Sequence, residues 1–162
     1  MEKIASFTVD HLQLKPGVFV SRLDRFGDTV ITTFDLRFKK PNKEPVIDMP
    51  ALHTIEHLGA TFLRADPIWG QRIIYFGPMG CRTGFYLILE GMLVSEDILS
   101  LLIAMLEWIQ HFKGTIPGAS AAECGNWREH NLDMARYEAE RYAALLKAAT
   151  FENLNYPAQQ TV

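Results

Sequence analysis

The sequence contains little cysteine and no surplus of positive charge. Only two of its 162 residues are cysteines, Cys81 and Cys124, so disulfide bonds cannot be the main support of the fold. Lysine and arginine together number 16 against 19 aspartates and glutamates, and the net charge of −3 gives no general attraction to phosphate backbones or anionic lipids. We therefore expect neither a nucleic acid nor a membrane as a partner.

Long apolar runs are also missing from the sequence. The longest apolar stretches are too short to cross a bilayer, and the first residues, MEKIASFTVDH, carry charge where the apolar region of a signal peptide would lie. On this basis we expect a cytoplasmic protein. In that reducing compartment a cysteine is more often a metal ligand, a nucleophile or a core residue than half of a disulfide.

The apolar content is nonetheless sufficient for a hydrophobic core. With 48% hydrophobic and 22% charged residues, the composition is that of an ordinary globular domain. A chain of this length can bury a core without disulfides or structural metals. We predict one domain over residues 1–149, followed by a loose C-terminal tail over residues 150–162.

The spacing of apolar residues predicts both strands and helices. Apolar side chains alternate from Thr29 to Lys39, which predicts a half-buried strand. Two short β-rich segments cover residues 72–76 and 84–90, and helical patterns cover residues 49–65, about 95–114 and about 131–147. This uneven mixture favours an α+β fold in which an antiparallel sheet has helices packed on one face.

Two histidines stand four positions apart in the first predicted helix. His53 and His57 therefore project from one helix face about one turn apart, a spacing that lets both bind one divalent ion. Glu56 lies between them, and a carboxylate beside a metal can move protons to and from bound water or substrate. The alternative is a chance spacing of two surface or structural histidines.

Cys124 lies in a glycine-flanked loop and is a candidate for a third ligand. A thiolate suits a borderline-soft divalent metal, and three protein ligands leave the open coordination position of a catalytic site. The alternative is a small core residue, the commonest fate of an intracellular cysteine.

Cys81 lies in the glycine-rich turn PMGCRTG, next to Arg82. Glycines let the backbone turn sharply, and the arginine charge would favour a thiolate, so Cys81 is a candidate acid/base or nucleophile. A buried inert thiol is the alternative. Asp35 and Arg37 share the polar face of the first predicted strand, where they indicate either a solvated face or an arginine that grips a carboxylate.

Taken together, these segments resemble the S-ribosylhomocysteine lyase family (LuxS). The likeness extends from about residue 4 to 147 and rests on motifs that occur in the family's order: SFTVDH at 6–11, FDLRFKKPN at 34–42, HTIEH at 53–57, PMGCRTGFY at 78–86, and Cys124-Gly125 with His130 six positions after the cysteine. The combination is far more specific than any single motif.

The resemblance implies a lyase that splits S-ribosylhomocysteine into homocysteine and 4,5-dihydroxypentane-2,3-dione, the precursor of autoinducer-2, in methyl-cycle recycling and quorum sensing. It implies one divalent metal per chain, usually ferrous iron with zinc or cobalt as substitutes. It also implies a homodimer whose interface forms both active sites. The roles carried over are metal ligands for His53, His57 and Cys124, proton transfer for Glu56 and Cys81, and substrate contacts for Ser6, His11 and Arg37.

The chain departs from the family pattern at one position. The family usually has an aspartate three residues before the proline of PMGC, where this sequence has Tyr75. A tyrosine can donate a hydrogen bond but supplies no carboxylate, so we expect an altered substrate contact.

Two other functions compete with the lyase: a metallopeptidase in which Glu56 activates a metal-bound water, and a non-catalytic metal-binding module.

Overall fold

A four-stranded antiparallel sheet forms the centre of the molecule. The computed structural model describes residues 9–157, and the strands lie side by side in the order β1-β2-β4-β3. Their bounds are Gly17–Phe26 for β1, Thr29–Arg37 for β2, Ile73–Pro78 for β3 and Gly84–Glu90 for β4. Alternation along β2 and β4 places Phe34, Leu36, Phe85 and Leu87 in the core, all fully buried, and turns Asp35 and Tyr86 to the opposite face.

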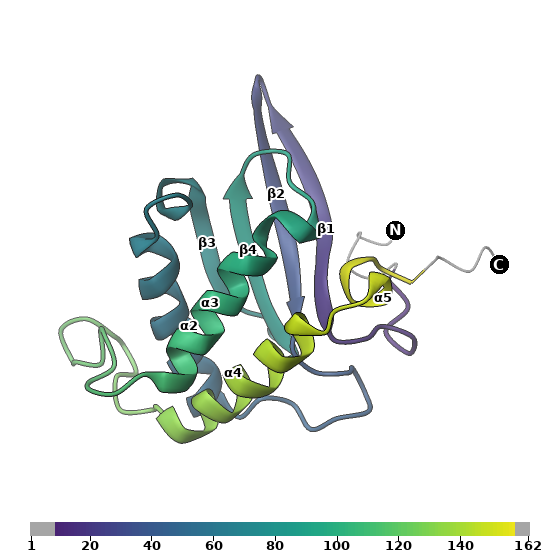
Figure 1. Ribbon diagram of the computed structural model, residues 1–162. Coiled ribbons are helices and arrows are strands. Elements are labelled where there is room, and N and C mark those ends of the chain that lie inside the picture. The colour runs from purple at the N-terminus through teal and green to yellow at the C-terminus, as the bar shows by residue number, and fades with distance from the viewer. Residues whose placement is uncertain (1–8, 158–162) are drawn as a thin grey trace, which may run out of the picture.

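Three helices cover one face of this sheet (Figure 1). They are α2 (Met49–Ala65), α3 (Leu99–His111) and α4 (Leu132–Lys147), and the short 3-10 helices η1 (Gly70–Arg72) and η2 (Ser95–Ile98) precede β3 and α3. The helices bury their apolar stripes against the core face of the sheet. The predicted α+β fold, with helices on one face of an antiparallel sheet, is confirmed.

Helix α2 carries the histidine pair and begins where the sequence indicates. The side chain of Asp48 caps the helix by accepting a hydrogen bond from the backbone N–H of Ala51, and Pro50 occupies the first turn. Leu52, Ile55 and Leu58 face the core, whereas His53, Glu56 and His57 are only half-buried. The burial of one side of α2 therefore presents its polar side to solvent.

The first strand, β1, was not predicted because its alternation is interrupted. A β-bulge between Val20 and Arg22 shifts the register against β2, so the pattern of period two breaks in mid-strand. Phe19 is fully buried although it lies on the face away from the helices.

Two predicted elements have different bounds in the structure. The helix predicted over about residues 95–114 starts as η2 and ends at His111, and the strand predicted to reach Lys39 ends at Arg37 as β2.

The C-terminal segment packs against the body of the protein as far as Tyr156, where we had expected a loose tail. Its residues 151–154 form the short helix α5 (Phe151–Leu154) beside β1 (Figure 1). The side-chain amide of Asn153 donates to the carbonyl of Pro16, and the ring of Tyr156 stacks on Phe19. Residues 158–162 of the expected tail lie outside the described part of the chain.

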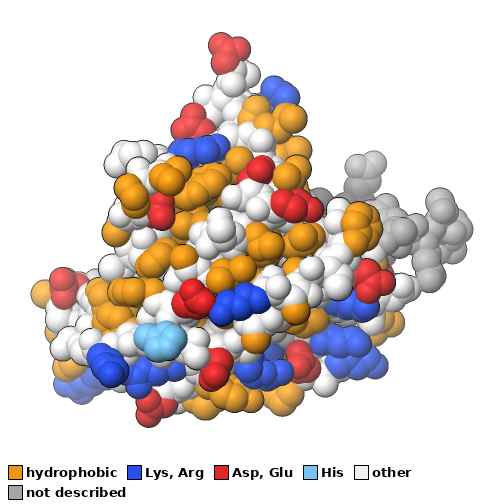
Figure 2. All heavy atoms as spheres, viewed as in Figure 1, with side chains coloured by type: hydrophobic (Ala, Val, Ile, Leu, Met, Phe, Trp, Pro, Cys, Tyr) orange, Lys and Arg blue, Asp and Glu red, His pale blue; other side chains and the backbone are white. Residues whose placement is uncertain are grey.

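Acidic and basic side chains are interspersed on the face that Figure 2 shows. This view therefore has none of the continuous basic surface that binds phosphate backbones. Within residues 9–157, no helix combines the length and apolar character needed to cross a membrane.

Candidate active site

His53, His57 and Cys124 come together at the outer side of α2. One ligand atom from each residue lies within 4.8 Å of the other two, and this is the one group of potential metal ligands found among residues 9–157. The Sγ atom of Cys124 lies 3.4 Å from Nε2 of His53. Two such donors bound tetrahedrally to one zinc-like ion would be about 3.5 Å apart, so the spacing fits a shared metal.

Backbone carbonyls fix the tautomers of both imidazoles. Nδ1 of His53 lies 2.9 Å from the carbonyl oxygen of Glu129, and Nδ1 of His57 lies 2.8 Å from that of Pro117. A carbonyl can only accept, so each Nδ1 carries the hydrogen and each Nε2 keeps a free lone pair. Such outer hydrogen bonds orient metal-bound histidines and raise their basicity.

The loop that supplies the carbonyl for His57 depends on a glycine. Gly118 follows Pro117 and has a φ of 72°, in the left-handed region that favours glycine. A Cβ atom added there would lie 3.1 Å from Nδ1 of His57. Gly118 therefore allows both the turn and the close approach of the loop to the ring.

A third histidine borders the cluster. The ring of His130 stacks on that of His53, with centroids 4.3 Å apart, and its Nδ1 lies 3.2 Å from the hydroxyl of Thr54. Because that hydroxyl donates to the carbonyl of Pro50, His130 is the donor in this pair. Its Nε2 atom is buried and has no partner within the described chain, which is unusual for a buried polar atom and is typical of a site that a further group completes.

The ligand cluster lines an open pocket of about 570 Å³ that also includes Glu56. The pocket walls come from α2 and from the loop that holds Pro117, Gly118 and Cys124. Free lone pairs on two imidazoles, a thiol and a nearby carboxylate match the donor set and the open position of a catalytic metal site. The residues present therefore fit one divalent ion.

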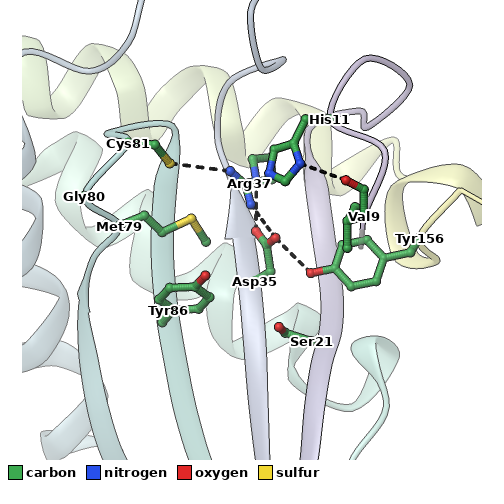
Figure 3. A pocket seen from close by; sticks show the side chains of 10 residues that line it. All are labelled: Val9, His11, Ser21, Asp35, Arg37, Met79, Gly80, Cys81, Tyr86 and Tyr156. Atoms are coloured by element: carbon green, nitrogen blue, oxygen red, sulfur yellow. Dashed lines mark hydrogen bonds and ion pairs between the residues drawn. The ribbon is translucent and has the colours of Figure 1, made fainter. Parts of the chain in front are cut away.

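Cys81 belongs to a second pocket, of about 240 Å³, on the face of the sheet away from the helices (Figure 3). The turn over residues 79–82 presents it: the N–H of Arg82 donates to the carbonyl of Met79, and Arg82 has a φ of 57°. The Sγ atom lies 3.1 Å from the hydroxyl of Thr83 and 3.8 Å from Nη1 of Arg37.

These contacts favour the thiolate of Cys81. Partial burial raises the pKa of the thiol, but hydrogen bonds from the side chain and backbone of Thr83, together with the charge and N–H of Arg37, outweigh it and leave the pKa below its ordinary value. The sequence placed Arg82 in this role. In the fold the stabilising cation is Arg37, which reaches the thiol from the neighbouring strand β2.

Arg37 grips a carboxylate from its own strand. Its Nε and Nη2 donate to the two oxygens of Asp35 at 3.1 and 2.5 Å, and its Nη1 donates to Thr83 and points at Cys81. Arg37 and Asp35 are both about 4% exposed, so the solvated-face alternative is wrong. Among residues 9–157 the second Nη2 hydrogen has no acceptor, so it can bind a further group.

The remaining predicted site residues do not all lie at one pocket. His11 lines the Cys81 pocket, and its Nδ1 donates to the carbonyl of Val9. Ser6 lies outside the described residues. Tyr75 lines neither pocket; its hydroxyl lies over Gly77, where an added Cβ atom would be 2.0 Å away. Glu56 and Cys81 line different pockets.

Among the side chains in and around the Cys81 pocket that were not predicted from the sequence are Thr83, Tyr86 and Tyr156. Thr83 was overlooked beside the more conspicuous cysteine, although it stands in the same turn. Tyr86 alternates with core residues of β4 and was therefore open to detection by period. Tyr156 gave no signal, because it follows the last predicted helix and reaches Asp35 only through the fold.

Comparisons with known proteins agree with this geometry. A profile of the family described as S-ribosylhomocysteinase (LuxS) matches residues 4–152. A Clostridium acetobutylicum protein named S-ribosylhomocysteine lyase is 58% identical over 157 residues, which cover 97% of this chain and 99% of that protein. Proteins of the same name from Borreliella afzelii and Porphyromonas gingivalis are each 54% identical, over 97% of this chain and over 100% and 99% of their own lengths. The chain belongs to the S-ribosylhomocysteinase (LuxS) family.

Proposed function

We propose that the chain is a metal-dependent lyase that splits S-ribosylhomocysteine into homocysteine and 4,5-dihydroxypentane-2,3-dione. The observation that carries the proposal is the cluster of His53, His57 and Cys124, with two Nε2 lone pairs and a sulfur facing one open pocket. The relatives named for this activity, at 54% identity or more over nearly the whole chain, support the choice of substrate.

The reaction moves a carbonyl group along the opened sugar until the thioether lies β to a ketone and can be eliminated. When bound, a divalent metal supplies Lewis acidity to the carbonyl and hydroxyl oxygens. His53, His57 and Cys124 would hold it and leave a position free. We propose ferrous iron, with zinc or cobalt as substitutes, because imidazole and thiolate donors suit all three.

Each carbonyl shift requires a proton to leave one carbon and another to arrive at its neighbour. Glu56 lines the metal pocket and would serve as one proton carrier. Cys81, held toward its thiolate form by Thr83 and Arg37, would serve as the other. His11 and the free Nη2 hydrogen of Arg37 would contact the substrate, and Ser6 keeps its predicted role as a further contact.

The positions of the two carriers favour a homodimer. The Cys81 pocket lies on the sheet face away from the helices, whereas the metal pocket lies in the helical layer, and no residue lines both. One short substrate cannot bridge the sheet of a single chain. We propose that the Cys81 pocket of one chain faces the metal pocket of another, in a cytoplasmic enzyme whose cysteines remain free.

The direct test is release of a free thiol from S-ribosylhomocysteine by protein loaded anaerobically with ferrous iron. We expect stoichiometric homocysteine and dione. A peptide substrate serves as the control for the metallopeptidase alternative and should stay intact. Absence of thiol release with iron, cobalt and zinc alike would overturn the proposal and leave a non-catalytic metal-binding module.

A further inference from the structure

Tyr156, from the C-terminal segment, lines the Cys81 pocket on the side opposite Cys81 (Figure 3). Its ring stacks on Phe19, with centroids 4.7 Å apart and planes 10° apart, and its hydroxyl donates to Oδ2 of Asp35 at 2.9 Å. Phe19 and Asp35 are direct partners in the register of β1 and β2. One tyrosine therefore fixes two neighbouring side chains on the same face of the sheet.

Asp35 needs such a partner because its carboxylate is buried. Burying an ionised carboxylate is costly unless its lone pairs are paired. The two oxygens accept from Nε and Nη2 of Arg37, and Oδ2 also accepts from Tyr156. Within the described part of the chain, Arg37 and Tyr156 are the side chains that donate to this carboxylate, and the tyrosine hydroxyl supplies the contact that Arg37 does not.

The position of Asp35 determines where Arg37 points. Because the guanidinium is planar and its Nε and Nη2 are bound to Asp35, its Nη1 is left facing Thr83 and Cys81. The other titratable groups that line the pocket are His11 and Tyr86. Tyr156 therefore stands at the far end of a chain of contacts that runs through Asp35 and Arg37 to the thiol.

We propose that Tyr156 is a positioning residue of this pocket: its hydroxyl holds Asp35, and through it Arg37, in the arrangement that keeps Cys81 a thiolate. The link to turnover rests on the proposed function, in which Cys81 carries a proton. The link to the thiol itself rests only on the contacts described.

The hydroxyl of Tyr156 is suited to this task because it stays protonated. Burial raises its pKa, and the adjacent charge of Asp35 raises it further, so it remains a donor at every working pH. Without the hydroxyl, the Asp35 carboxylate would lose one hydrogen-bond donor, and the Arg37 guanidinium would be drawn closer to that carboxylate. Both effects disfavour a thiolate beside Arg37 and raise the pKa of Cys81.

The test compares Tyr156→Phe with Tyr142→Phe in the full chain. Tyr156→Phe keeps the ring on Phe19 and removes one hydrogen bond. Tyr142→Phe also removes one hydroxyl, but that hydroxyl donates to the backbone carbonyl of Gly17 and not to Asp35. The pH dependence of iodoacetamide alkylation at Cys81, followed on its own peptide by mass spectrometry, reports the thiol pKa without any need for turnover.

We expect Tyr156→Phe to raise the pKa of Cys81 by roughly half a unit to one unit, the scale of one lost charge-stabilising contact. Alkylation at neutral pH should slow several-fold, kcat should fall with little change in KM, and Tyr142→Phe should do neither. A truncation after Asn155 should shift the pKa at least as far.

An unchanged Cys81 pKa in both Tyr156→Phe and the truncated chain would overturn the positioning role, and wild-type turnover would still support the lyase. If the wild-type chain released no homocysteine, the alkylation comparison would still decide the role of Tyr156.

Discussion

The Nε2 atom of His53 lies 3.4 Å from the Sγ atom of Cys124, although 71 positions separate the two residues. Cys124→Ala should therefore remove the sulfur donor and leave a pair of imidazoles that binds a divalent ion weakly. We expect about one ion per wild-type chain and almost none in the variant, measured by elemental analysis after dialysis. Cys81→Ala, the same change in the other pocket, is the control and should keep its metal. Full metal content in Cys124→Ala would show that the ligand assignment is wrong.

Gly118 is expected to affect metal binding without being a ligand. Gly118→Ala would strain the backbone at a φ of 72° and place a methyl group against Nδ1 of His57. Loss of an outer hydrogen bond to a metal ligand typically weakens binding by about 10- to 100-fold. The measurement is a competition titration with a chelator. Gly114→Ala, also at a left-handed φ but with no atom near its added Cβ, should leave the affinity unchanged.

The pH profile should respond to Thr83. Its hydroxyl lowers the pKa of Cys81, so Thr83→Val should raise that pKa and move the rising limb of kcat to higher pH. At neutral pH less thiolate would be present, and turnover should fall while activity recovers in more alkaline buffer. Thr33→Val makes the same change on β2, on the sheet face that carries Asp35 but outside the pocket, and should leave the profile in place. A profile unaltered by Thr83→Val would remove the thiolate from the mechanism.

How far the sequence predicts this site depends on how many positions separate the two residues of each contact along the chain. The spacing of His53 and His57 is a local property of a helix, so the pair was visible at once. Cys124 could be a ligand or a core residue on the sequence alone, because folding brings it to His53 across a separation of 71 positions. The thiol partner was misassigned to the adjacent Arg82 because the true partner, Arg37, lies 44 positions away on another strand.

The fold was predicted where the apolar pattern is regular, and it was missed where the pattern is interrupted or where a contact joins residues far apart in the sequence. Strands β2 and β4 alternate cleanly and were predicted within two residues, while the bulge in β1 erased the signal of a strand that is ten residues long. The contact of Tyr156 with Asp35 spans 121 positions and follows no periodic pattern.

Mixed chains can test the shared active site. In a dimer of Cys81→Ala with Glu56→Gln, one site would combine an intact Glu56 with an intact Cys81 and the other would lack both. Each variant alone should lose turnover by about a hundred-fold or more, the usual scale for a positioned acid or base. Verified mixed dimers should regain activity. If each chain holds a complete site of its own, mixing will restore nothing.

Stability should depend on a buried ion pair that ties α4 to the chain just beyond β2. Nζ of Lys39 lies 2.6 Å from Oε1 of Glu138, and their side chains are 5% and 7% exposed. Glu138→Gln would leave a buried ammonium without its counter-ion, at a cost of about 3 kcal/mol in the free energy of unfolding. Urea denaturation measures this cost. The exposed pair of Lys147 and Glu107 is the control, and Glu107→Gln should change stability by about 1 kcal/mol or less.

The contacts between β1 and the C-terminal segment also bear on the order in which the protein folds during synthesis. Asn153 donates to Pro16 across 137 positions, and the ring of Tyr156 stacks on Phe19. Contacts of such high sequence separation form late, because the entropy of closing the intervening loop is lost before they contribute. In a nascent chain translated only as far as the end of α4, the four strands are present and can pair. Phe19 on β1 would still lack the Tyr156 ring that stacks on it. The edge strand β1 of that intermediate is the part of the molecule that a chaperone would need to shield until residue 156 emerges.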